Sequence, residues 1–490
     1  MPPRPGPEPA SLAETAARGV GILVSRTLAL QLLTAGVTLV LARLLSPADY
    51  GLFALAAAVQ SVAQVTSGAG LSAALIRQKE DPSPAQQRAV SGFLLSTGLA
   101  FSAATAAIAL AALPAAGVHG KTLGVIAVTG LAVPLYALRA VPMVLLERHL
   151  RFGRVAVVET AETLAFNAFA LLGALGGLGA YSLAGGVPAA AAAGLLAVLS
   201  LQGSFAGLSL ELGVVRRLAD FGLRASALQM LAIVRNLGFV TVVTAIAGTT
   251  TTGFYAMGTR LFAFPTALAS AVQRVSFPAL SRSPEERPRR AARAAALSAA
   301  LASLPLALLA GASHPLVTVL LGERWLPTVD ILLASSPGVL LAASAIPAMV
   351  ALALSQGRPG GPIAAVIGSA LAMVGASAAT VPGMGAVGIG IATTAGAIVN
   401  AAMLAGHTEP AMRRAAGPVA LSLAVGAVAA AAGYLAPLPD SWLGLAGQLA
   451  IVAAVWIALG LGLMRPLLHD AWRLARPLLP PRLLPATWRP

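Results

Sequence analysis

Long apolar segments alternate with short polar connections along almost the whole chain. None of these segments shows the alternate-residue apolar pattern of a barrel strand, and each reaches the ~20 residues that a helix needs to cross a bilayer. A backbone in lipid must satisfy its own hydrogen bonds, so helices remain as the spanning element. We therefore predict an all-α polytopic membrane protein with about 14 transmembrane helices. They are expected at residues 18–45, 49–75, 89–113, 122–146, 155–177, 180–202, 218–247, 252–280, 294–320, 327–356, 361–381, 384–405, 416–436 and 442–464.

Basic residues are distributed unevenly among the connections. Of the 32 Lys and Arg residues, 23 lie in every second connection and at the two ends of the chain, whereas the other connections hold only Arg43, Lys121 and Arg324. Short loops rich in Lys and Arg stay on the cytoplasmic side of a membrane. The distribution therefore predicts that both termini are cytoplasmic. The first apolar segment carries Arg26 and is too long for a signal peptide, so we expect it to be the first membrane helix.

The composition supports a membrane protein and disfavours several other classes. The chain is 58% apolar and 10% charged, and its net charge of +15 lies in loops that meet anionic headgroups rather than on a polar surface that binds nucleic acid. Cysteine is absent, which excludes disulfides and thiolate chemistry. The five histidines show no pairing with acids, and no serine is arranged as a nucleophile. We expect no metal site, no cofactor and no enzymatic activity. Residues 115–122 loosely match a phosphate-binding loop, but they fall in an outer connection where nucleotide binding is not expected.

Short matches indicate two related halves. Pro142 and Pro347, each preceded by Ala and a β-branched residue, lie 205 positions apart, and Gly51 and Gly253 lie 202 apart in similar surroundings. A shift of six helices preserves membrane orientation, so we expect parallel six-helix lobes with a substrate cavity between them, followed by two extra helices. The predicted organisation is a cytoplasmic segment 1–17, an N-lobe 18–202, a linker 203–217, a C-lobe 218–405, extra helices 406–464 and a basic interfacial tail 465–490.

Several motifs resemble those of a known transporter family. Residues 41–55 read LARLLSPADYGLFAL, and similar motifs follow at 139–152, 253–261 and 322–327. Over most of residues 18–360 they resemble the O-antigen and exopolysaccharide (Wzx-type) flippases of the multidrug/oligosaccharidyl-lipid/polysaccharide (MOP) exporter superfamily. One position departs from the pattern, because Gly238 stands where many relatives carry an acid. An ion-binding or substrate-binding role of that acid is therefore in doubt here.

The resemblance implies a function. Such proteins move an oligosaccharide linked to a polyprenyl diphosphate, of the undecaprenyl type, from the inner to the outer leaflet of the bacterial inner membrane for lipopolysaccharide or exopolysaccharide synthesis. It also implies membrane lipids and glycan polymerase or ligase machinery as partners, a monomeric state and no nucleic acid.

Charged residues inside the predicted helices are the candidate site. Arginine in the bilayer is unfavourable by at least ~2.5 kcal/mol, so it normally faces a cavity or a partner, and its planar fork suits a diphosphate. Arg235 is the strongest candidate because it lies near the middle of its helix with no acid within one turn. The expected substrate-binding residues are Arg235, Arg260, Arg26, Arg139 and Arg274.

Other interpretations apply to some of these charges. Asp220 and Arg224 are four residues apart, which favours a structural ion pair. Arg139 and Arg274 alternatively extend to the cytoplasmic interface. The two remaining acids, Glu159 and Glu162, either neutralise Arg26 or Arg139 or carry a coupling proton.

Two other functions stay open. A cation-coupled small-molecule exporter of the same architecture is expected to place acids in its cavity, whereas the embedded charges here are mainly basic. An integral-membrane glycan ligase or polymerase fits less well, since it needs a large outer loop and the outer connections of this chain are short.

Overall fold

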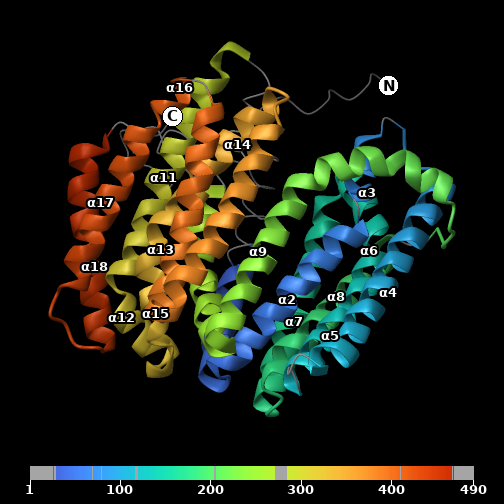
Figure 1. Cartoon of the computed structure of the whole chain (residues 1–490), viewed down its shortest axis with the longest axis horizontal. Coiled ribbons are helices and arrows are strands. Elements are labelled where there is room, and N and C mark those ends of the chain that lie inside the picture. Colours follow the sequence, from blue (N-terminus) through green and yellow to red (C-terminus); the bar gives the residue numbers. More distant parts are fainter. Residues whose placement is uncertain are drawn as a thin grey trace, which may run out of the picture.

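Helices form all the regular secondary structure in the described part of the chain. The computed structural model describes residues 26, 29–68, 70–78, 80–115, 120–202, 206–270, 284–408, 410–465, 467 and 469. After the helix Ala29–Leu44, the elements are α2 (Pro47–Gly68), α3 (Leu71–Arg77), α4 (Pro84–Ala115), α5 (Lys121–Gly130), α6 (Ala132–Arg148), α7 (Phe152–Leu175), α8 (Ala180–Gln202), α9 (Leu212–Leu261), η1 (Pro284–Glu286), α11 (Arg287–Gly311), α12 (Ser313–Leu316), η2 (Val317–Leu321), η3 (Glu323–Trp325), α13 (Pro327–Ala343), α14 (Ala345–Ser355), α15 (Gly360–His407), α16 (Pro410–Arg413), α17 (Ala416–Tyr434) and α18 (Trp442–Leu463) (Figure 1).

Two of these helices are hairpins in which the chain reverses at a glycine. A straight helix over Ser226–Ser270, 45 residues, would be about 68 Å long, twice the ~30 Å of a bilayer core. Gly248 has φ 78° inside α9, and Gly385 has φ 53° inside α15. Eight residues of straight helix cover about 12 Å, yet the hydroxyl oxygens of Thr244 and Thr252 lie 2.8 Å apart across the first turn. Each hairpin therefore supplies two membrane-spanning helices.

The predicted number of spans agrees with this architecture. Ten helices of the described chain are long and apolar enough to cross a membrane, and the two hairpins among them raise the number of spans to twelve. The helix Ala29–Leu44 and the 22-residue α2 complete fourteen. The protein is thus an all-α, multi-pass membrane protein. One boundary differs, since α9 already begins at Leu212, inside the segment expected to be a linker.

The helices form two bundles and an additional pair. The N-terminal bundle comprises the helix Ala29–Leu44 and α2 to α8, and the C-terminal bundle comprises α9 from Ser226 onward and α11 to α15 (Figure 1). The first part of α9 crosses from one bundle to the other, and α17 and α18 pack on α11 at the far side of the C-terminal bundle (Figure 1). The bundles meet mainly where α2 contacts α9.

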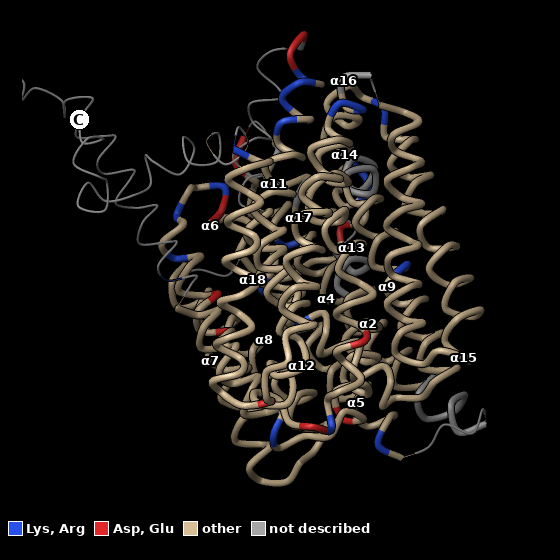
Figure 2. Tube along the Cα trace, turned by 90° about the vertical axis from the view of Figure 1, so that its left-hand side faces the viewer, with Lys and Arg blue, Asp and Glu red and all other residues tan. Residues whose placement is uncertain are grey.

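The two ends of the molecule differ in charge. Figure 2 shows Lys and Arg gathered at the end near α16, which we call the basic end, and few at the opposite end near α5 and α12, the sparse end. The sparse end carries Arg43, Lys121 and Arg324, the three basic residues of the charge-poor connections. The separation of charge predicted from the sequence is therefore present in the fold.

Candidate functional site

The two bundles pack most closely at two glycines of the sparse end. A Cβ atom on Gly51 of α2 would lie 1.8 Å from the carbonyl oxygen of Thr249, and one on Gly253 of α9 would lie 1.8 Å from that of Pro47. No side chain fits at these distances. Glycine at both positions thus lets two backbones from different bundles touch.

Arginines reinforce this contact from both sides. Arg43 of the N-terminal bundle donates hydrogen bonds to the carbonyls of Val319 (2.5 Å) and Leu320 (3.2 Å) in the C-terminal bundle. In the opposite direction, Arg324 donates to the carbonyls of Ala42 (2.8 Å) and Arg43.

An aromatic ring lies beside this arginine pair. The ring nitrogen of Trp325 donates to the Ala42 carbonyl at 2.9 Å, and the fully buried rings of Trp325 and Tyr50 meet edge to face at 5.2 Å. We call this set the outer clasp: Arg43, Tyr50, Arg324 and Trp325 with the carbonyls that they hold.

Arg260 lies between the bundles next to the outer clasp. Its guanidinium carbon, on the second arm of α9, sits 4.8 Å from the ring centre of Tyr50 and 5.9 Å from that of Phe53, both on α2. A cation over an aromatic face is stabilised by roughly 1–2 kcal/mol when it is removed from water. Within the described residues, no acid forms an ion pair with Arg260.

Two embedded arginines of the N-terminal bundle are paired with acids of α7. Arg26 contacts Glu159 at 2.8 Å, with side chains 24% and 51% exposed. Arg139 of α6 donates to Glu162 at 3.1 Å, with side chains 17% and 18% exposed. Two roles were expected for Glu159 and Glu162. The structure shows the contacts with Arg26 and Arg139 that charge pairing requires.

Arg235 lies in the C-terminal bundle and lines a cavity of about 270 Å³. The walls come from α9, α13, α14 and α15, so all described lining residues belong to one bundle. Its guanidinium donates to the Ser369 hydroxyl at 3.1 Å. The helix arm that crosses the membrane begins near Ser226 and turns at Gly248, so Arg235 is close to its middle. Binding of the substrate by Arg235, expected from the sequence, stays a prediction.

The side chains of the remaining predicted site residues lie outside the described part of the structure. Arg274 lies outside the described residues. Asp220 and Arg224 belong to α9, but their side chains lie outside the described part of the chain. Their proposed ion pair stays a prediction.

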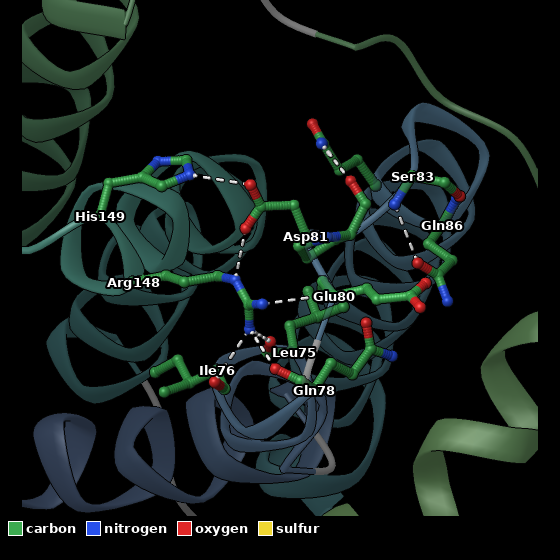
Figure 3. Close-up of polar contacts among 11 residues, drawn as sticks. Leu75, Ile76, Gln78, Glu80, Asp81, Ser83, Gln86, Arg148 and His149 are labelled. Atoms are coloured by element: carbon green, nitrogen blue, oxygen red, sulfur yellow. Dashed lines mark hydrogen bonds and ion pairs between the residues drawn. The ribbon is translucent and has the colours of Figure 1, made fainter.

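Sequence reasoning missed a polar cluster at the basic end. Arg148 at the end of α6 contacts Asp81 at 2.8 Å. It also donates to four backbone carbonyls in the last turn of α3 and directly after it (Figure 3), namely those of Leu75, Ile76, Gln78 and Glu80. The hydrogen bond from Arg148, and after it the weaker effect of the hydrogen bond from His149, lowers the pKa of the Asp81 carboxyl. Arg148 therefore fixes the connection between α3 and α4, beyond its contribution to membrane orientation. Asp81, an acid within a basic connection, was the feature of the sequence that could have predicted this cluster.

Comparisons with known proteins agree with this fold. A family model described as "Polysaccharide biosynthesis protein" matches residues 40–330, while no curated protein sequence matches the chain. Among solved structures, the lipid II flippase MurJ in an inward closed conformation is similar with a TM-score of 0.72, at 15% identity, over 91% of this chain and 100% of that one.

Multidrug transporters share the fold at lower similarity. An inward-facing MATE family transporter of the MOP superfamily has a TM-score of 0.52 at 15% identity, over 81% of this chain and 93% of its own. A mutant of the Vibrio cholerae MATE transporter VcmN also has a TM-score of 0.52 at 15% identity, over 82% and 97%. The chain thus shares the fold of these proteins, and the family match covers more than half of the sequence. The chain therefore belongs to the polysaccharide biosynthesis protein family.

Proposed function

We propose that this protein flips a polyprenyl-diphosphate-linked oligosaccharide from the inner to the outer leaflet of the bacterial inner membrane, with Arg260 as the main contact to the diphosphate. The observation that carries the proposal is the position of Arg260. It is an embedded cation between the two bundles, over aromatic rings and with no acid paired to it in the described structure.

The chemistry of the substrate matches that position. A charge inside the membrane needs a counter-charge or water, and a diphosphate accepts paired hydrogen bonds from the planar guanidinium. Residues between two bundles experience the largest change when the bundles rock, so a ligand held there is exposed alternately to the two sides. The MurJ neighbour, a lipid II flippase, shows that this fold accommodates a lipid-linked substrate in another protein.

Arg26 is proposed as an assisting contact. It reaches Glu159 through one nitrogen, while its Nε and Nη1 are buried with no hydrogen-bond partner in the described structure. With the bundles joined at the sparse end and the basic end facing the cytoplasm, as the basic loops predict, the substrate enters from the inner leaflet.

Substitution of Arg260 tests the proposal. Full-length protein is reconstituted in vesicles, and outward movement of a lipid-linked oligosaccharide is measured per folded molecule. Removing hydrogen bonds to a charged group costs about 1.5–3 kcal/mol, so Arg260→Gln should lower the rate roughly 10- to 100-fold. Arg260→Lys should retain an intermediate rate, because the charge survives without the paired geometry.

The matched control is Arg358→Gln, which removes one positive charge from an exposed site at the basic end and should leave the rate unchanged. A wild-type rate for Arg260→Gln would contradict the diphosphate contact. Export of cationic small molecules by wild-type protein that moves no lipid-linked oligosaccharide would instead favour the exporter function.

A further inference from the structure

We propose that the cavity around Arg235 is a binding site for a monovalent inorganic anion of the chloride class. The site lies inside the C-terminal bundle and is separate from the contact between bundles at Arg260, so the inference does not depend on the proposed substrate.

The cavity holds one fixed positive charge and no negative one. Arg235 is its single charged lining residue in the described structure, and no Asp or Glu lines it. A cavity needs only about 10–15 Å³ of accessible volume to hold one water, so the observed 270 Å³ accommodates a small anion together with several waters. An arginine in the membrane without an acid is unfavourable unless another group neutralises it. A cation is excluded by the same charge.

Hydrogen-bond donors around this cavity are available to a ligand. Guanidinium carries five N–H donors, of which one is used on Ser369, and the Nε atom is buried with no partner. Tyr255 also lines the cavity, and its hydroxyl makes no hydrogen bond within the described residues. The buried Oδ1 of Asn400 also has no partner in the described structure, but as an acceptor it can bind only a water of the cavity and not the anion. Buried groups of this kind normally bind water or an ion.

Neighbouring hydroxyls do not compete for Arg235. Thr393 donates to the Gly390 carbonyl at 2.8 Å, and the hydroxyls of Ser335 and Thr393 lie 2.9 Å apart. Ser335 and Thr393 thus satisfy each other and leave the donors of Arg235 and Tyr255 to the ligand.

The charge balance favours a monovalent anion over a diphosphate. One guanidinium neutralises one negative charge, and no second basic residue lines this cavity in the described structure to assist it as Arg26 is proposed to assist Arg260. All described walls also belong to one bundle, whereas a lipid-linked substrate needs the space between bundles. A halide satisfies both conditions because it is small and carries a single negative charge. It also accepts hydrogen bonds from every direction.

The test uses purified full-length protein in lipid nanodiscs with gluconate as the inert anion. Sodium chloride replaces sodium gluconate at constant sodium, and the midpoint of thermal unfolding is followed. A ligand that binds only the folded state raises the midpoint as its concentration exceeds Kd. We expect a saturable rise for the wild type and for Arg260→Gln, and no rise for Arg235→Gln.

A second variant and a direct probe keep the test decisive. Tyr255→Phe removes one donor without the charge and should raise the apparent Kd for chloride about tenfold, even where Arg235→Gln fails to fold. Bromide should appear by anomalous scattering within hydrogen-bond distance of Arg235. A chloride effect that persists in Arg235→Gln, the absence of an effect in the wild type, or displacement of the bromide by equimolar pyrophosphate would overturn the assignment.

Discussion

In the N-terminal bundle both embedded arginines that the structure describes contact a glutamate, whereas in the C-terminal bundle neither Arg235 nor Arg260 does. The difference follows from the acidic residues that individual helices carry. Glu159 and Glu162 lie three residues apart on α7, so they share a face and reach arginines from two other elements. By contrast, α15 carries no Asp, Glu, Lys or Arg along its 48 residues. The embedded arginines of the N-terminal bundle are thus largely neutralised. Apart from the Nε and Nη1 atoms of Arg26, the positive charge available to anionic ligands among the described residues belongs to the C-terminal bundle.

The largest effect on stability is expected from breaking the more buried pair. Glu162→Gln leaves Arg139 without its counter-charge, and removing one partner of a buried ion pair typically destabilises a protein by about 3 kcal/mol or more. The yield of folded protein and its thermal midpoint should both fall. The double variant Arg139→Gln with Glu162→Gln should recover most of the loss. A double variant as unstable as the single one would show that the two side chains do not compensate each other.

A smaller loss is expected at the more exposed pair. Glu159 is 51% exposed, so water partly replaces it when Arg26 loses its contact, and Glu159→Gln should reduce the free energy of unfolding by about 1 kcal/mol. The measurement is the same thermal midpoint in the same lipid. A loss as large as that of Glu162→Gln would mean that exposure does not separate the two pairs.

The smallest effect on stability is expected when the C-terminal bundle receives an acid of its own. In Ser369→Asp the carboxylate replaces the hydroxyl that lies 3.1 Å from Arg235. A buried ion pair roughly balances its desolvation cost, so the thermal midpoint should change little, but the chloride effect should disappear because the charge is already neutralised. Persistence of the chloride effect in this variant would show that the anion binds elsewhere.

The helices were predictable from the sequence because the length of an apolar segment is a local property. The reversal at Gly248 falls between two segments that were expected to be separate, and that at Gly385 lies one residue after the predicted start of the second segment of its pair. The central depth of Arg235 followed from its place in its helix. The start of α9 at Leu212 was not expected, since a polar amphipathic segment looks like a connection until it packs on α3 and α4.

The partners of the charged residues were much harder to predict from the sequence. Glu159 and Glu162 were recognised as possible neutralising acids, but the specific assignment to Arg26 and Arg139 depends on how α6 and α7 pack. The outer clasp was missed altogether. Arg43 and Arg324 were noted only as rare charges of their connections, and the carbonyls that they hold lie more than 270 residues away in sequence.

The outer clasp joins the two bundles through neutral acceptors. Its donors are guanidinium and indole N–H groups, and its acceptors are main-chain carbonyls. If the bundles separate at the sparse end, water hydrates the freed carbonyls and guanidinium groups, so each bond contributes only about 1 kcal/mol net. This contact between the bundles can therefore open one hydrogen bond at a time, with a small change in free energy at each step.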